Sequence, residues 1–268
     1  MTTGDLDMQA TKTPVLEAVN ISKSYGEKQV LADVSFSAAE GEFVCIVGPS
    51  GTGKTTLLRT LSALGTANSG EVRVNGTAIT RPPAEVSVVF QDYSRSLMPW
   101  MRVGKNIELP LRRYNLSPAE RATRVTEALR DVGLEHAKDL YPWEMSGGMQ
   151  QRAAIARSLA YRPQVLIMDE PFASVDAQTR ADLEDLMLDI RARLGVTIVL
   201  VTHDIEEAVY LGDKVIVLSG RPASVSATVD VPLGRTRDQI STKSRPDYLE
   251  LRAKIHAMIM QSPSSVSG

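Results

Sequence analysis

One short segment combines glycines, a lysine and hydroxyl side chains at a spacing that suits phosphate binding: Gly48, Pro49, Ser50, Gly51, Thr52, Gly53, Lys54 and Thr55. It fits the pattern G-x-x-x-x-G-K-[ST], in which the backbone wraps so that its N–H groups point at phosphate oxygens. The Lys54 ammonium is expected on the β- and γ-phosphates, and the Thr55 hydroxyl on Mg²⁺. An apolar strand at 43–47 and a helical stretch at 56–64 favour this interpretation over an incidental glycine-rich turn.

A pair of carboxylates ends a second apolar run. The residues 165–168 are Val-Leu-Ile-Met, and Asp169 and Glu170 follow them. Ligands of open α/β sheets collect beyond the carboxyl ends of the strands. Asp169 is therefore expected to hold Mg²⁺, directly or through water, and Glu170 to face the γ-phosphate and activate a water molecule.

A third apolar run, 196–202, ends at His203. Asp204, with Glu207 three residues later, looks like a helix start, so His203 could simply adjoin a helix cap. The alternative is contact with the γ-phosphate, since this strand end is expected at the same sheet edge as Glu170.

The elements needed to position these residues follow from the hydropathy pattern. Continuous apolar strands alternate with helices in the second half of the chain, which predicts an α/β fold with a buried parallel sheet. Strands without helices, before about residue 40 and at 71–90, predict an antiparallel β subdomain. The segment 92–163 is mostly helical and predicts an inserted α-helical subdomain.

Helical stripes can be assigned within this pattern. A capping box at Ser117 is expected to open one helix, with Ala122, Val125, Leu129 and Val132 inward. A second stripe contains Leu183, Leu186, Met187, Ile190 and Leu194, and a last helix is expected at about 247–260.

Composition excludes several other classes of protein. The chain of 268 residues has 30 Lys+Arg and 32 Asp+Glu, a net charge of −2, which gives no support to nucleic-acid binding. Its single cysteine, Cys45, excludes an internal disulfide framework and a cysteine-based zinc site. The apolar runs are far shorter than the roughly 20 residues of a spanning helix. A role at a membrane would therefore need another chain to cross it.

The segment 145–152, Met-Ser-Gly-Gly-Met-Gln-Gln-Arg, resembles the signature of ATP-binding cassette (ABC) proteins. The physical logic is again a helix N-terminus, where a hydroxyl and bare N–H groups face an anion. The resemblance implies that this anion is the γ-phosphate of ATP held by a partner subunit's phosphate loop. The signature residues expected to contact ATP are Ser146, Gly147, Gly148 and Met149.

Other positions match the same family in order. Tyr25 resembles the aromatic residue that stacks on adenine, and Gln91 resembles a glutamine that touches Mg²⁺ and attacking water. Asp176 lies in a segment similar to the family's D-loop, and His203 resembles its switch histidine. Thr56 completes the expected ATP-binding set. The expected catalytic residues are thus Glu170, His203 and Gln91, and the expected metal ligands are Thr55, Gln91 and Asp169.

The resemblance covers about residues 14–260 and implies a P-loop NTPase fold with a RecA-like core sheet. Segments such as 91–93, 97–100, 141–143 and 202–211 look like the ATPases of nitrate/sulfonate/taurine-type importers. This implies an ATPase with ATP and Mg²⁺ as cofactors, a homodimer, a transmembrane permease and, indirectly, an extracytoplasmic solute-binding protein. The implied location is the cytoplasmic face of the cell membrane, held peripherally through the permease.

The domain organisation expected is an N-terminal tail at 1–13, an ABC ATPase domain at 14–240 with its helical subdomain at about 92–163, a C-terminal helix at 241–261 and a tail at 262–268. The segment after Val231 is either a regulatory extension or only a packing helix.

The alternative function is a soluble ABC-type ATPase not coupled to transport. Rivals from DNA repair or translation fit less well, because the 92 residues between Lys54 and Ser146 leave no room for a long coiled coil and only one motif set is present.

Overall fold

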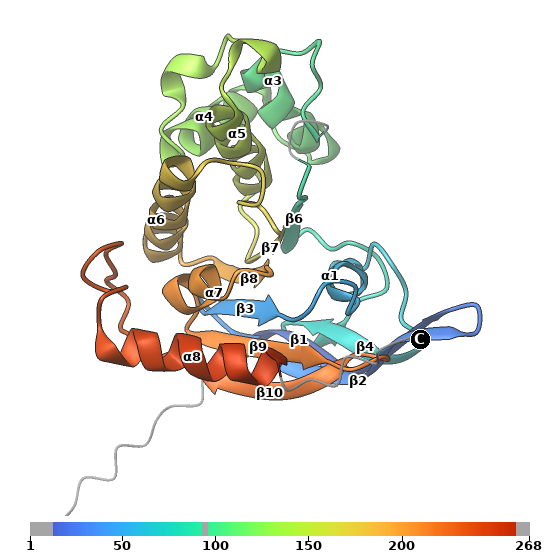
Figure 1. Cartoon of the computed structure of the whole chain (residues 1–268). Helices are drawn as coiled ribbons and strands as arrows, with labels where there is room; N and C mark the ends of the chain where they lie inside the picture. The colour runs from blue at the N-terminus through green and yellow to red at the C-terminus, as the bar shows by residue number, and fades with distance from the viewer. Residues whose placement is uncertain (1–12, 93–95, 261–268) are drawn as a thin grey trace, which may run out of the picture.

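The computed structural model describes residues 13–92 and 96–260 (Figure 1). Residues 1–12 of the tail expected at 1–13, the tail expected at 262–268, and Tyr93 of the importer-like motif lie outside the described residues. Within these ranges the chain forms two sheets and a helical part that rises above them in Figure 1.

The central sheet of the described chain has six strands in the order β10-β9-β3-β8-β7-β6. Neighbours from β9 to β6 are parallel, and β10 is antiparallel to β9. The strands are β3 (Phe43–Val47), β6 (Val86–Val89), β7 (Val165–Asp169), β8 (Thr197–Val201), β9 (Lys214–Ser219) and β10 (Ser224–Asp230). The buried parallel sheet predicted from the apolar runs is therefore present, and its carboxyl edge gathers the chain segments that follow β3, β7 and β8.

A second, antiparallel sheet has the order β2-β1-β4-β5 within the described residues. Its strands are β1 (Pro14–Tyr25), β2 (Lys28–Ala39), β4 (Ser69–Val74) and β5 (Thr77–Ala78). The antiparallel subdomain was thus predicted, but its strands are longer than the apolar runs in the sequence. The run at 86–90, also expected in this subdomain, instead forms β6 of the central sheet, where its mostly buried residues pair in parallel with β7. Strand β2 mixes polar and apolar residues, because only its inner face is buried.

The helices divide into two groups. The segment between β6 and β7 contains α3 (Val103–Glu108), α4 (Pro118–Asp131), α5 (Gly147–Leu159) and the 3₁₀ turns at 109–113, 135–137 and 142–144. The others follow strands or end the described chain: α1 (Lys54–Leu61), α6 (Ala177–Leu194), α7 (Ile205–Leu211) and α8 (Pro246–Met260). In Figure 1 α8 lies along the side of the sheets, below α7.

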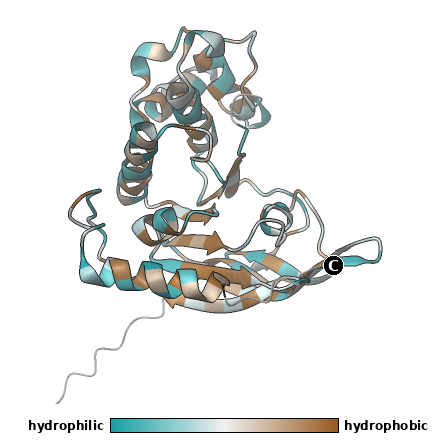
Figure 2. Cartoon of the chain, in the orientation of Figure 1, coloured by the Kyte–Doolittle hydropathy of each residue, from teal (hydrophilic) through white to brown (hydrophobic). Residues whose placement is uncertain are grey.

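Alternate residues of the central strands enter two different cores. Phe43, Cys45 and Val47 of β3 pack with the helical part and with α6–α8, whereas Val44 and Ile46 pack with α1 and the antiparallel sheet. Both faces of β3 are therefore covered, as its continuous apolar run requires. Figure 2 shows hydrophobic colour along the central strands and mixed colours on the helices.

Some local predictions need correction. The helix expected at 56–64 begins at Lys54 and ends at Leu61, and Leu64 is exposed. Ala122 of α4 and Leu194 of α6 are exposed rather than inward, and Leu194 is the last residue of its helix. The capping box at Ser117 is confirmed: its side chain accepts from the Glu120 amide, and the Glu120 carboxylate accepts from the Ser117 amide.

No helix in the described ranges has the length and apolar character needed to cross a bilayer.

Candidate functional site

The phosphate-loop candidate connects β3 to α1, and the space around two of its glycines leaves no room for a side chain. Gly53 precedes α1 with φ of 88°, and a Cβ there would lie 2.6 Å from Val30 Cγ1. A Cβ on Gly48 would lie 2.6 Å from the carbonyl oxygen of Leu218 on β9. The positive φ and the two close approaches explain why glycine is needed at these positions.

Lys54 is buried at the first turn of α1 and is turned back over the loop. Its Nζ donates to the carbonyl oxygens of Gly48, at 2.9 Å, and Pro49, at 3.2 Å. Burial lowers the pKa of Lys54, and the carboxylates of Glu170 and Asp169 oppose this shift. The ammonium is therefore a desolvated cation, and the low local dielectric strengthens its attraction for an anion.

Asp169 is the last residue of β7 and is only 6% exposed. Its pKa is raised, first by burial and then by the negative charge of Glu170, while a hydrogen bond from the Thr55 hydroxyl and the charge of Lys54 lower it. The carboxylate thus lies beside the Thr55 hydroxyl. Both groups are hard oxygen donors of the kind that Mg²⁺ prefers, and two adjacent carboxylates are an environment that a divalent cation relieves.

Glu170 and His203 meet at the carboxyl edge of the sheet. The His203 Nδ1 lies 3.0 Å from Glu170 Oε2, although 33 residues separate them. The Glu170 amide donates to the carbonyl oxygen of Val201 on β8, which continues the pairing of β7 and β8 by one residue. The φ of Glu170 is +42°, a left-handed conformation that costs a non-glycine residue free energy and occurs often at functional sites.

A buried network behind His203 was not predicted. The Thr202 hydroxyl donates to Glu207 Oε2 at 2.7 Å and accepts from the Asp204 amide at 3.0 Å. Arg180, on α6, lies 3.4 Å from Asp204 and 3.7 Å from Glu207. Burial raises the pKa of Glu207 to about 7. The network ties the start of α7 to α6, and its only signal in the sequence was the capping pattern of Asp204 and Glu207.

Two further predicted residues lie at exposed positions. Gln91 follows β6, which pairs in parallel with β7, so it is at the same sheet edge as Asp169 and Glu170. Tyr25 ends β1 at the hairpin with β2 and is 54% exposed, with the Lys23 ammonium 5.2 Å from its ring centroid. An exposed ring of this kind is available for stacking.

The signature candidate opens α5, at a distance from the first cluster in the fold. Ser146 is the exposed N-cap, and its hydroxyl accepts from the Met149 amide at 3.3 Å. A Cβ on Gly148 would lie 2.6 Å from Thr179 Cγ2, and Thr179 in turn donates from its amide and hydroxyl to the Asp176 carboxylate. The starts of α5 and α6 are therefore packed directly against each other.

The predicted residues thus form two groups. Lys54, Thr55, Asp169, Glu170 and His203 meet beyond the carboxyl ends of β3, β7 and β8. The second group, at the starts of α5 and α6, contains Ser146, Gly147, Gly148, Met149 and Asp176. Helix α1 packs mainly on β2, β7 and β8, whereas α5 packs on α3, α4, α6 and β6.

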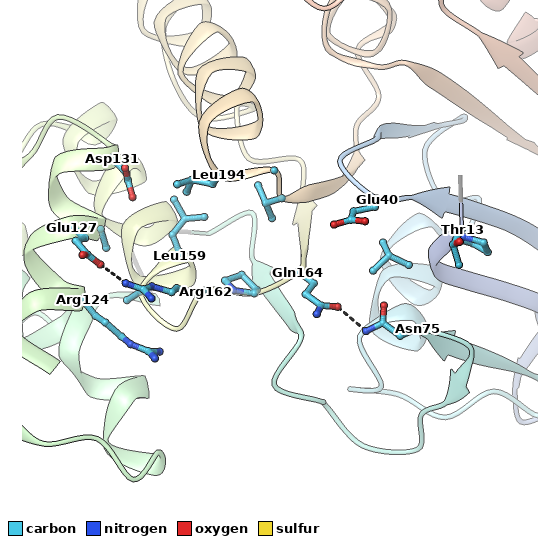
Figure 3. A pocket seen from close by; sticks show the side chains of 17 residues that line it. Thr13, Glu40, Asn75, Arg124, Glu127, Asp131, Leu159, Arg162, Gln164 and Leu194 are labelled. Carbon is cyan, nitrogen blue, oxygen red and sulfur yellow. Dashed lines mark hydrogen bonds and ion pairs between the residues drawn. The ribbon is translucent and has the colours of Figure 1, made fainter. Parts of the chain in front are cut away.

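A pocket of about 820 Å³ lies at the opposite edge of the central sheet (Figure 3). Its wall includes Arg124, Glu127 and Arg162 on one side and Glu40 and the hydrogen-bonded pair Asn75–Gln164 on the other, as Figure 3 shows. It contains none of the predicted site residues and adjoins the starts, not the ends, of β7 and β8. The Lys54 group therefore lies at the other edge of the sheet, away from this pocket.

The sequence is similar to known proteins over most of its length. Residues 31–173 match the model of the family described as ABC transporter. The chain is 41% identical over 239 residues to the nitrate import ATP-binding protein NrtD of Synechocystis sp., covering 87% of this chain and 89% of that protein. It is 40% identical over 247 residues to the aliphatic sulfonates import ATP-binding protein SsuB 2 of Burkholderia lata, covering 92% and 86%.

Among solved structures, the chain is similar to a dimeric post-hydrolysis state of the ATP-binding cassette MJ0796 bound to ADP and Pi, with a TM-score of 0.69 and 32% identity. The match covers 98% of that chain but 81% of this one, so about a fifth of this chain has no counterpart there.

Proposed function

Because the chain belongs to the ABC transporter family, we propose that it is the ATP-binding and ATP-hydrolysing subunit of an importer. It powers the uptake of a small anionic solute, such as nitrate, a sulfonate or taurine, through a separate permease. The family membership supports the ATPase activity, and the identity to nitrate and sulfonate import subunits over most of the chain supports the direction and the class of solute.

The observation that carries the proposal is the contact between Glu170 and His203 at 3.0 Å, beside the buried Lys54 and Asp169. A carboxylate and an imidazole so close together beyond the strand ends support a role for both at one reacting centre. Glu170 polarises the attacking water, and His203 orients Glu170 and the γ-phosphate. Lys54 releases the loop carbonyls when its ammonium binds the β- and γ-phosphates.

Magnesium fits the same edge. The Thr55 hydroxyl and the Asp169 carboxylate are neighbouring oxygen donors, and Gln91, which follows β6, would add an amide oxygen. Mg²⁺ would neutralise charge on the phosphate oxygens during transfer. The adenine stacks on the exposed ring of Tyr25, and the loop residues 48–56 bind the phosphates.

The second group of residues acts in a neighbouring subunit. Ser146 and the bare amides of Gly147 and Gly148 form a helix N-terminus suited to an anion. In a homodimer, the Ser146 helix of one protomer closes over the ATP bound to the phosphate loop of its partner. Binding closes the pair and phosphate release opens it, so the nucleotide biases a two-state element.

The permease binds the exposed aromatic surface of the helical part. Trp100 is 72% exposed and adjoins Pro99 and Met101, and Trp143 is 70% exposed and stacks on Tyr141. Such exposed tryptophans are typical anchors of protein interfaces. Through this surface the ATPase is held at the cytoplasmic face of the membrane, and an extracytoplasmic solute-binding protein serves the permease.

The test combines hydrolysis with transport. The purified chain is expected to release phosphate from ATP in the presence of Mg²⁺ and to co-purify with a membrane subunit from its own cells. Cells lacking the chain should lose uptake of one labelled anionic solute, and the wild-type chain but not Lys54→Ala should restore it. Failure to hydrolyse ATP contradicts the enzyme assignment, whereas hydrolysis without a membrane partner favours an ATPase not coupled to transport.

A further inference from the structure

The segment after β10 forms hydrogen bonds with both ends of α7, the short helix that begins two residues after His203. Residues 231–260 run from the end of β10 across α6 and α7 and finish in α8. The family match ends at residue 173, so it does not include this segment. Helix α7 has only seven residues, and a helix of that length depends on tertiary contacts for its position.

Arg237 holds the C-terminal end of α7. Its side chain is fully buried, and its guanidinium donates to the carbonyl oxygens of Val209, at 3.2 Å, Gly212, at 2.9 Å, and Tyr210. The last carbonyls of a helix have no partner within the helix, and a cation there is favoured by the helix dipole. One planar guanidinium thus fixes the end of α7 from the C-terminal segment.

Two residues of α8 hold the opposite end. The buried Tyr248 donates its hydroxyl to the carbonyl oxygen of Glu206, at 3.2 Å, and Arg252 donates to the Glu206 carboxylate, at 2.7 Å. Both contacts lie three residues beyond His203. The C-terminal segment therefore clamps α7 at its first turn and at its last.

Packing does little to fix the imidazole itself. His203 is 58% exposed at its side chain and lines an open hollow of about 740 Å³ between α7 and α8, together with Glu206, Arg252 and His256. Its contact with Glu170 therefore depends on the position of the His203 backbone. That position is set on one side by β8 and on the other by α7.

We propose that Arg237 is a positioning residue for ATP hydrolysis, which acts through His203 by fixing α7. The C-terminal segment is then a working part of the ATPase site rather than an appended packing helix. This inference rests on the proposed function, because it needs His203 to take part in hydrolysis. Arg237 touches no predicted ATP-binding residue, so its removal changes the turnover rate and leaves nucleotide binding intact.

The test uses the full chain with Arg237→Ala and, as the matched control, Arg245→Ala. Arg245 belongs to the same segment but pairs with Asp247 and the carbonyl oxygen of Leu233, away from α7. Arg237→Ala is expected to lower kcat for ATP between about tenfold and a hundredfold, since small misplacements of catalytic groups cost that much. KM and the affinity for ATP should stay unchanged, and Arg245→Ala should match the wild type.

A double-mutant cycle with His203→Ala separates positioning from simple damage. If Arg237 acts through His203, Arg237→Ala has no further effect on kcat in the His203→Ala background. Multiplied losses, or a loss that tracks only the fraction of folded protein, would overturn the inference. A wild-type chain without ATPase activity would instead refute the proposed function.

A milder variant keeps the test valid if Arg237→Ala does not fold. Tyr248→Phe removes only the hydroxyl that donates to Glu206 and retains the buried ring. It is expected to lower kcat several-fold, again with unchanged KM and with no further effect in the His203→Ala background. Unchanged kcat in Tyr248→Phe together with full activity in Arg237→Lys would contradict the clamp.

Discussion

At the scale of single residues, the site depends on two acids whose environments differ although they are adjacent. Asp169 is nearly buried and its pKa is raised, whereas Glu170 turns out of the strand in a left-handed conformation to meet His203. Burial favours a role in holding a cation, and the more open position favours contact with water. The same dipeptide thus suits the two proposed functions because the chain turns between its residues.

Glu170→Gln is expected to bind ATP as tightly as the wild type and to hydrolyse it at least about a hundredfold more slowly. Glutamine keeps the shape and a hydrogen bond to His203 but cannot accept a proton from water. Nucleotide affinity is measured by calorimetry and turnover by phosphate release. Glu135→Gln, a surface acid paired with Arg130, is the control. Brisk hydrolysis by Glu170→Gln would remove Glu170 from the catalytic role.

Much of this residue-level picture was predictable, for a physical reason. The phosphate loop is a local motif, so its glycines and lysine can be recognised from their spacing alone. The meeting of Glu170 and His203 was also expected, since both follow parallel strands that end at one sheet edge. Arg237 gave no signal, because its hydrogen-bond acceptors are backbone carbonyls, which every sequence provides.

At the scale of secondary-structure elements, the close packing of α5 on α6 depends on a missing side chain. Gly148→Ala would place a Cβ 2.6 Å from Thr179 Cγ2, and Thr179 cannot easily rotate because its hydroxyl donates to Asp176. The variant is expected to lose about 1–3 kcal/mol of stability, as overpacked cores do. Chemical denaturation measures this change.

The matched rescue is Thr179→Ser, which deletes the clashing methyl group and keeps the hydroxyl that bonds Asp176. The double variant should regain most of the stability lost by Gly148→Ala, while Thr179→Ser alone changes little. A double variant as unstable as Gly148→Ala would mean that the cost arises elsewhere in the signature helix.

The start of α7 carries a pH-dependent contribution to stability. Burial raises the pKa of Glu207 to about 7, with Asp204 and Glu184 adding to the shift and Thr202 and Arg180 opposing it. Because the folded pKa exceeds the ordinary value of 4.5, this contribution is complete below pH 4.5 and is lost as pH rises through about 7. The expected loss is on the order of 3 kcal/mol.

Glu207→Gln should remove that dependence, since its amide does not ionise but still accepts from the Thr202 hydroxyl. Urea unfolding between pH 5 and 8.5 is expected to show a flatter profile for Glu207→Gln than for the wild type. Glu250→Gln, an exposed position on α8, provides the comparison. Parallel profiles for all three proteins would show that Glu207 does not ionise in this range.

The bounds of helices and strands were predicted less accurately than the local motifs. The Ser117 capping box could be identified because both partners lie within four residues. Strand β2 was not delimited, since its polar outer face interrupts the apolar pattern. Leu194 fitted the helical stripe of α6 but is exposed, because the helix ends there at Gly195 and the core does not extend so far.

At the scale of the whole molecule, the predicted site residues of one chain form two groups in different parts of the fold. The Lys54 group lies at the carboxyl edge of the central sheet. The Ser146 group lies at the N-terminus of α5, in the helical part between β6 and β7. A homodimer with each ATP between the loop of one protomer and the signature of its partner accounts for both. The arrangement predicts complementation between two inactive chains.

Lys54→Ala disables the phosphate loop, and Ser146→Arg blocks the signature with a large side chain at an exposed N-cap. Each homodimer then lacks any intact site. A mixed dimer contains one doubly disabled site and one intact site, formed by Lys54 of the Ser146→Arg chain and Ser146 of the Lys54→Ala chain. Mixing the two purified variants should therefore restore ATP hydrolysis, to at most about a quarter of the wild-type rate if the two sites act independently and subunits exchange at random.

The control is a single chain carrying both substitutions, mixed with either single variant, which can form no intact site and should stay inactive. Differently tagged variants show by pull-down in ATP that subunits exchange. Exchange without recovered hydrolysis has two physical meanings that a further mixture distinguishes. If wild-type chains mixed with an excess of the double variant also lose activity, the site is shared between subunits, because such a dimer contains no intact shared site. The inactivity of the mixed dimer with one intact site then means that both sites must be intact for hydrolysis. If the wild-type chains keep their full rate despite exchange, each chain hydrolyses ATP alone, and the shared site is refuted.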